Sequence, residues 1–289
     1  MSHHTLQKLV VRMLYDDAFV TAVHAAPDAA LKGLDLTAAE RAQLLAVDQR
    51  AWRHDALRRK RSLRALVEEF KVSTTIILAE TRALASLEQY FSSTHFHQAI
   101  QQRGSLGLSF SEFLLDGCRN GNWRAPQIPD IVRLEAAVAA CRRTLAREGE
   151  YEPAELPATI NDRARVRLAP GFGVASFQAN VIEAIQTVEQ YLFELSLMPA
   201  MALCDDAPRL PELPSVELKR KLYLLFSPGA TGISLTTIDQ PTWAVLGEAK
   251  RSVEIRSLLQ RAGQAGIKAA QAQEILAEWL ESSGLMLLS

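Results

Sequence analysis

Two short apolar segments near the C-terminus constrain the fold of this chain most strongly. They are residues 222–226, Leu-Tyr-Leu-Leu-Phe, and residues 233–238, Ile-Ser-Leu-Thr-Thr-Ile. Segments of this length that are rich in aliphatic, aromatic and β-branched side chains predict strands. The intervening residues 227–232 contain proline and glycine and favour a hairpin with a bulged or wider loop. Three segments with helical periodicity follow, so we expect a hairpin and then three helices.

The N-terminal half has the apolar spacing of helices. Near the N-terminus, apolar side chains recur every three or four positions, at Leu6, Leu9, Val10, Met13 and Leu14. Similar spacing predicts helix over residues 74–102. Thr37 with Glu40, and Ser109 with Glu112, have the spacing of capping boxes, which predicts that helices begin at these two places.

A change in composition marks a candidate domain boundary. Residues 148–153, Glu-Gly-Glu-Tyr-Glu-Pro, and the nearby Pro157 interrupt the helical pattern. We therefore expect a helical bundle over residues 1–150 and a second domain over residues 151–289.

The second domain combines short strands with helices. Residues 165–168, Arg-Val-Arg-Leu, alternate in polarity like a strand that Pro170 and Gly171 end. Residues 178–197 predict an inserted helix, and a connector with Pro199, Pro208, Pro211 and Pro214 leads to the hairpin. Asp239 is expected to cap the next helix, with Pro241 in its first turn, and Gly284 to end the last helix. The predicted class is α+β, mostly α, with a small three-stranded antiparallel sheet.

Composition and charge exclude some classes of protein. The 289 residues are 48% hydrophobic and 22% charged, and the formal net charge is −1. A dedicated nucleic-acid binder is usually basic, so this balance argues against one. Three cysteines at Cys118, Cys141 and Cys204, with no C-x-x-C motif, indicate a reduced, cytoplasmic setting. We expect neither a signal peptide nor a membrane span.

The sequence contains no recognisable catalytic motif. It lacks G-x-S-x-G, a P-loop, G-x-G-x-x-G and H-E-x-x-H. His95 and His97 form an H-x-H pair that would share one face of a strand and could bind a metal ion there. In the predicted helix over residues 91–100 the two side chains point about 200° apart, so we expect no metal site.

Two groups of residues are candidates for contact with a partner. The basic run that contains Arg58, Arg59 and Arg61 suggests either a nucleic-acid contact, a contact with an acidic partner, or a solvated helix face. Trp123 and Arg124 lie in the predicted loop over residues 120–126. They could anchor an interface, because both residue types are enriched at binding hot spots, or pack on their own domain.

The C-terminal elements resemble a known peptide-binding domain. The hairpin, the helix led by Asp239 and the two helices that end near 283–285 look like the winged-helix RiPP recognition element, which captures leader peptides of ribosomally made natural products. The strand at residues 165–169 is similar to the first strand of that domain. The resemblance implies that Ile233, Ser234, Leu235, Thr236, Thr237 and Ile238 form a receiving strand for a peptide, and Ile275 and Trp279 are candidates for the wall of its groove.

The N-terminal half resembles a second family. Residues 91–100, Phe-Ser-Ser-Thr-His-Phe-His-Gln-Ala-Ile, and residues 126–135, Pro-Gln-Ile-Pro-Asp-Ile-Val-Arg-Leu-Glu, are similar to partner proteins of DUF692-type multinuclear iron-dependent oxidases. Those partners act in pathways such as those to methanobactin and 3-thiaglutamate. The resemblance implies a non-catalytic subunit that holds no cofactor, binds a ribosomally made precursor peptide and docks on an oxidase that carries the iron. A DNA-binding regulator and a free-standing enzyme are the alternative hypotheses.

Overall fold

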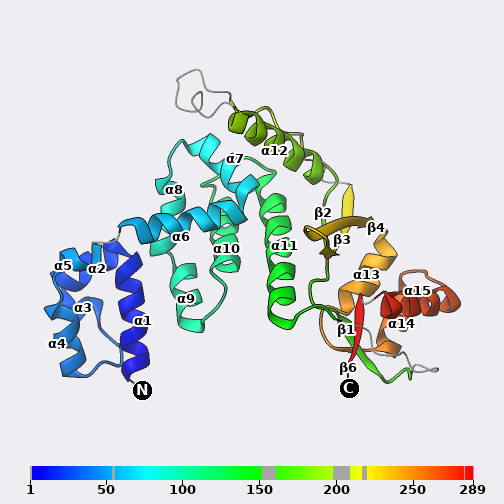
Figure 1. Ribbon diagram of the computed structural model, residues 1–289, viewed down its shortest axis with the longest axis horizontal. Coiled ribbons are helices and arrows are strands. Elements are labelled where there is room, and N and C mark those ends of the chain that lie inside the picture. The colour runs from blue at the N-terminus through cyan, green and yellow to red at the C-terminus, as the bar shows by residue number, and fades with distance from the viewer. Residues whose placement is uncertain are drawn as a thin grey trace. The chain divides into compact units, whose positions relative to one another are not determined.

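The computed structural model describes residues 2–53, 56–151, 161–197, 209–216, 220–282 and 284–288 (Figure 1). The chain divides into two compact units, Met1–Val132 with Val188–Pro211 and Arg133–Thr187 with Glu212–Ser289. Helices dominate, and two small antiparallel sheets accompany them, which confirms the α+β, mostly α class. This division falls inside a long helix, whereas the sequence suggested a boundary near residue 150. Pro153, Pro157, Pro199, Pro208 and Cys204 lie outside the described residues.

The first unit is built from helices. They are α1 (Ser2–Tyr15), α2 (Asp17–Ala25), α3 (Pro27–Ala30), α4 (Ala38–Ala46), α5 (Gln49–Arg53), α6 (Ala56–Glu69), α7 (Lys71–Thr81), α8 (Ala85–Glu88), the 3-10 helix η1 (Gln89–Ser92), α9 (Thr94–Gln102), α10 (Leu106–Arg119), the start of α11 (Ile128–Glu148) and the end of α12 (Val181–Leu197). Apolar side chains of α1 and α2, including the fully buried Met13 and Val20, contribute to one core cluster with residues of α4 and α5. Tyr90, Phe96 and Phe110 form an aromatic cluster, with ring centroids of Tyr90 and Phe110 5.1 Å apart.

The two predicted capping boxes have different outcomes. Thr37 accepts a hydrogen bond from the Glu40 N–H and Glu40 accepts one from the Thr37 N–H, so α4 begins as predicted. The box at Ser109 is wrong, because α10 begins earlier, with Ser105 as its N-cap. The Ser109 hydroxyl instead donates to the His95 carbonyl oxygen and links α10 to α9.

The predicted helix over residues 74–102 is interrupted in the structure. Arg82, with φ of 52°, ends α7 in the left-handed region, and Ser93 begins α9 as an N-cap that accepts from the Phe96 N–H. Periodicity alone did not reveal the break, because the apolar spacing continues across it.

The second unit contains both sheets. Its elements are the remainder of α11, β1 (Arg165–Leu168), β2 (Gly173–Gln178), the start of α12 (Val181–Leu197), β3 (Lys221–Gly229), β4 (Gly232–Ile238), α13 (Gln240–Glu248), β5 (Val253–Glu254), α14 (Ile255–Gln264), α15 (Ala269–Glu281) and β6 (Leu285–Leu288). The sheet orders are β5-β1-β6 and β2-β3-β4, with antiparallel neighbours.

The hairpin and the strand at residues 165–168 form as predicted, but their pairing differs from the expected single sheet. β1 pairs with β5 and β6, and the third strand beside the hairpin is β2. The wider hairpin loop is also wrong, because Gly229 pairs with Gly232 and leaves a two-residue turn. Gly232 has φ of 135°, a conformation open mainly to glycine, which allows the chain to reverse this tightly.

The helices after the hairpin begin as expected and end differently. Asp239 caps α13 by accepting from the Thr242 N–H, with Pro241 in the first turn. The expected helix end at Gly284 is wrong, because α15 ends at Glu281 and Gly284 precedes β6. A Cβ on Gly284 would lie 2.4 Å from Cε3 of Trp279, so the glycine is needed for close approach of this ring.

Candidate functional site

The strand β4 lies at the edge of its sheet. It pairs with β3 on one side, and no described strand pairs with its other side. An edge strand presents a row of N–H and C=O groups that an extended peptide can satisfy by adding a further strand. The segment that the sequence singled out therefore lies at a sheet edge that no described strand occupies.

The pairing of β3 identifies which residues of β4 point their backbone groups outward. The Ala179 N–H donates to the Arg220 carbonyl oxygen at 3.2 Å, which continues the β2–β3 ladder by one pair. In an antiparallel ladder successive residues bond to opposite sides, so Leu222, Leu224 and Phe226 bond towards β2. Tyr223, Leu225 and Ser227 then bond to β4, through Ile238, Thr236 and Ser234. The outward N–H and C=O groups consequently belong to Ile233, Leu235 and Thr237.

The side chains of β4 leave this edge accessible. Ser234, Thr236 and Thr237 are exposed, and Leu235 is 41% exposed, one of the large hydrophobic residues most open to solvent. Natural proteins often block strand edges with charged residues or proline. Residues 232–238 include neither. Ile238, at the other end, packs against the core of the second unit.

The sheet behind β4 is held from both faces. On one face, the Tyr223 ring of β3 contacts the Trp243 ring of α13, with centroids 5.1 Å apart. On the other, α11 lies so close to β2 that a Cβ on Gly173 would be 2.8 Å from the Cys141 sulfur. A strand backed in this way is held in an extended conformation, which would lower the entropic cost of adding a further strand.

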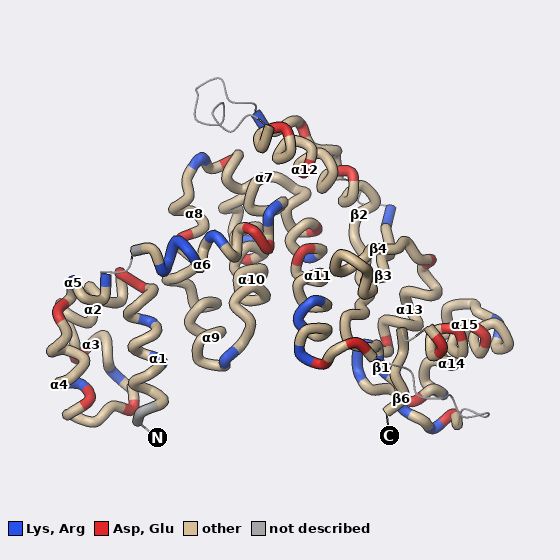
Figure 2. Tube along the Cα trace, in the orientation of Figure 1, with Lys and Arg blue, Asp and Glu red and all other residues tan. Residues whose placement is uncertain are grey.

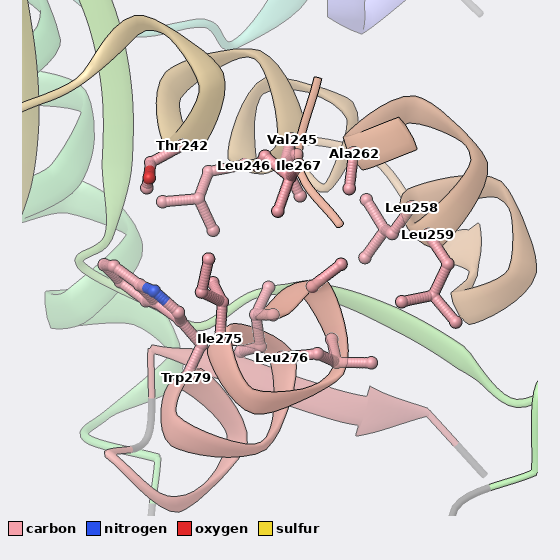
Figure 3. A pocket seen from close by; sticks show the side chains of 12 residues that line it. Thr242, Val245, Leu246, Leu258, Leu259, Ala262, Ile267, Ile275, Leu276 and Trp279 are labelled. Atoms are coloured by element: carbon pink, nitrogen blue, oxygen red, sulfur yellow. The ribbon is translucent and has the colours of Figure 1, made fainter. Parts of the chain in front are cut away.

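Ile275 and Trp279, the candidates for the wall of the groove, lie on α15. Both are half-buried on α15 and line a cavity of about 20 Å³ with apolar residues of α13 and α14 (Figure 3). A volume of this size holds about one water molecule. No residue of β4 lines the cavity. Ile275 and Trp279 therefore share this cavity with each other but not with β4.

Trp123 is a packed residue of the first unit. Its side chain is buried, and its indole N–H donates to the Leu114 carbonyl oxygen at 2.9 Å. Arg124 is exposed, and its backbone N–H donates to the Glu80 carboxylate. Packing on its own unit is thus what the structure shows for Trp123, and its burial gives an interface role no support.

The basic run lies on α6, which is conspicuous in Figure 2. Arg59 pairs with Asp17 at 2.5 Å, and its guanidinium lies 5.6 Å from the Phe91 ring centroid. Arg58 lies half-buried beside it, and Arg61 is exposed. At least one member of the run therefore connects α6 to other helices of its own unit.

His95 and His97 lie on α9, as the helical prediction required, and each meets a different carboxylate. His95 contacts Asp116, and His97 Nε2 lies 3.2 Å from Asp16 Oδ2. Burial of Asp16 opposes its ionisation, but the nearby His97 ring and the hydrogen bonds from the Phe19 N–H and the Ser92 hydroxyl lower its pKa to about 2. In the part of the chain that the structure describes, no three His, Cys, Asp or Glu residues gather as metal ligands.

The described cysteines, Cys118 and Cys141, are both free thiols. Burial raises the pKa of each to about 11, so both are protonated at neutral pH. A protonated thiol is a weak nucleophile, so neither has the environment of an activated catalytic cysteine.

Sequence reasoning missed β2, and it did not determine which backbone groups of β4 face away from β3. Pro228 gave a signal in the sequence about this register. Proline has no N–H to donate, so it suits a position in β3 whose backbone groups do not bond to β4. That position places its partner Ile233 in the outward set.

Comparison of the sequence with models of protein families, and with curated proteins, gives no match. Among the described helices, none combines the length and apolar character needed to cross a membrane.

Proposed function

We propose that this chain is a non-catalytic substrate-recognition subunit. It binds the leader of a ribosomally made precursor peptide along β4 and presents the peptide to a DUF692-type iron-dependent oxidase that modifies a cysteine. The open, uncharged edge of β4 is the observation that carries this proposal. The resemblance of the C-terminal elements to the RiPP recognition element supports the nature of the ligand.

The side chains near β4 favour particular peptides. Leu235 gives the edge an apolar contact, and the hairpin end carries a positive charge, because Arg142 Nη2 lies 3.8 Å from where a Cβ on Gly232 would be. Backbone pairing supplies affinity for any extended chain, and such neighbours supply selectivity. We expect the preferred leader to have an apolar residue opposite Leu235 and an acidic residue near the hairpin turn.

The first unit is the proposed docking surface for the oxidase. Its resemblance to oxidase partner proteins supports this assignment. Holding the peptide on the same chain that docks the enzyme raises the local concentration of the substrate, to about the millimolar range for short flexible links. The iron and the chemistry belong to the oxidase in this arrangement.

The decisive test of the binding edge is the substitution Leu235→Pro in the full chain. Proline removes one outward N–H and adds a ring where the incoming strand would lie, without removing a bond to β3. The probes are fluorescein-labelled synthetic peptides that tile every short reading frame beside the gene. For the peptide that binds, we expect at least about a tenfold loss of affinity by fluorescence anisotropy.

Leu235→Ala is the matched control, because it removes the side chain and keeps the N–H. It should bind more tightly than Leu235→Pro. Far-UV circular dichroism should match wild type for both variants. If a folded Leu235→Pro protein binds the peptide as wild type does, the edge is not the binding site and the proposal is wrong.

The substitution Thr236→Pro distinguishes damage to the hairpin from loss of peptide binding. The Thr236 N–H points towards Leu225 of β3, so its loss should loosen the hairpin itself. We expect faster amide hydrogen exchange in β3 for this variant and not for Leu235→Pro.

The partner assignment has its own test. An adjacent gene for a DUF692-type oxidase should yield a protein that copurifies with this chain and modifies the peptide only in its presence. Steeply salt-dependent binding to duplex DNA, lost on neutralising Arg58, Arg59 and Arg61, would instead favour the DNA-binding regulator.

A further inference from the structure

A second concave site lies in the second unit, apart from the β4 edge. It is an open cavity of about 300 Å³ between the C-terminal half of α11 and the strands β1 and β2. That volume is at the lower end of the range for small-molecule sites. No residue of β4 lines it, so the peptide edge does not account for this cavity.

The inner wall of the cavity is apolar and closely fitted. Phe226 and its partner Gly173 form the sheet side, and Ala140 and Cys141 form the helix side. Thr144 fixes the approach of α11, because its hydroxyl donates to the Cys141 carbonyl oxygen and accepts from the Gly171 N–H. The wall therefore offers a short aliphatic group a preformed surface.

The rim of the cavity has an excess of positive charge. Arg147 and Arg167 share one carboxylate, that of Glu148, at 2.5 and 2.7 Å. Lys250 is a third cation and has no ion pair within the described ranges. Figure 2 shows the basic residues that gather on the C-terminal half of α11 and on β1.

Lys250 is held at this rim by the backbone. The Leu168 N–H, at the end of β1, donates to the Ala249 carbonyl oxygen at 2.7 Å. Partial burial lowers the pKa of Lys250, because the charged ammonium loses part of its hydration beside the cavity. An anion in the cavity would compensate that loss.

We propose that this cavity binds a carboxylate carried on a short aliphatic body. The carboxylate pairs with Lys250, and the body packs against Phe226 and Ala140. Either a free carboxylic acid or the C-terminus of a peptide can supply this chemistry. This inference is independent of the proposed function, because it uses neither β4 nor the oxidase.

Cys141 allows a site-specific test in the full chain. Its thiol lines the cavity, whereas Cys118 lies in the first unit and serves as an internal reference. Both are modified with methyl methanethiosulfonate and quantified by peptide mass spectrometry. Hexanoate at about ten times its dissociation constant should slow modification of Cys141 about tenfold and leave Cys118 unchanged.

Controls separate charge from shape. Hexylamine has a similar apolar body with the opposite charge and should not protect Cys141. Ac-Ala-Ala-Ala-Leu with a free C-terminus, compared with its amide, distinguishes a peptide terminus from a free acid as the natural source. Protection by the free-acid peptide alone still supports the site.

Lys250→Met should weaken hexanoate binding at least about tenfold, since it removes the charge and keeps much of the chain length. Lys268→Met changes an exposed lysine of the same unit and should bind as wild type. Absence of protection by either carboxylate, or equal protection by hexanoate and hexylamine, would overturn the proposal. Because the ligand comparison uses wild-type protein, it does not depend on the folding of any variant.

Discussion

Gly117→Ala should destabilise the first unit by about 2–4 kcal/mol, although alanine normally stabilises a helix interior. Gly117 lies within α10, and a Cβ at this position would be 2.0 Å from Nε1 of Trp123. The indole cannot yield easily, because its N–H is bonded to the Leu114 carbonyl oxygen and its ring contacts Phe113. Urea unfolding followed by circular dichroism measures the effect.

Gly263→Ala is the matched control for this substitution. Gly263 lies in α14, and a Cβ there would meet no atom within 4 Å. We expect this variant to be stabilised by up to about 1 kcal/mol, as helix propensity alone requires. A Gly117→Ala protein as stable as wild type would show that Trp123 does not occupy the position described. In a Trp123→Ala background, the cost of Gly117→Ala should largely disappear.

Asp16→Asn should cost about 2–3 kcal/mol at neutral pH. Asp16 is 2% exposed and accepts hydrogen bonds from the Phe19 N–H and the Ser92 hydroxyl. Asparagine keeps one acceptor for the helix cap but removes the charge that faces His97. Chemical denaturation at pH 7 measures the loss.

The pH dependence has a definite sign. The pKa of Asp16 is about 2 in the folded chain and 3.8 as its ordinary value, so folding favours the ionised carboxylate. Its contribution of about 2 kcal/mol is fully present above about pH 4 and is lost as the pH falls through 2. The stability of wild type should therefore drop more steeply between pH 4 and pH 2 than that of Asp16→Asn.

Asp28→Asn is the control for the acid experiment. The Asp28 side chain is 93% exposed, and its ion pair with Arg41 lies on the surface. Exposed pairs contribute about 0–1 kcal/mol, so this variant should follow the wild-type pH curve. Identical curves for wild type and Asp16→Asn would contradict the role assigned to Asp16.

Local sequence signals located most elements but not their partners. Thr37 and Glu40 specify a helix start within four residues, so the capping box was readable from sequence. Ser109 has an equivalent pattern, yet Ser105 lies upstream and extends the helix past it. A cap signal identifies a possible start, and tertiary contact decides which start is used.

Strand pairing was harder to predict from the sequence, because it also depends on tertiary contact. The alternation at residues 165–168 predicted a strand correctly, but its neighbours β5 and β6 come from the C-terminal region, far along the chain. The strand at residues 233–238 was predicted as a segment, whereas its outward set of Ile233, Leu235 and Thr237 required the register with β3. Side-chain periodicity does not say which neighbour a backbone group faces.

The edge of β4, which no described strand covers, also has a consequence for the chain by itself. Any extended segment can pair with it, including β4 of a second molecule, and such pairing begins strand-mediated aggregation. A peptide bound along this edge, as proposed above, would shield it from such pairing. Coproduction with the bound peptide should therefore raise the soluble yield, and Leu235→Lys should raise it without any peptide.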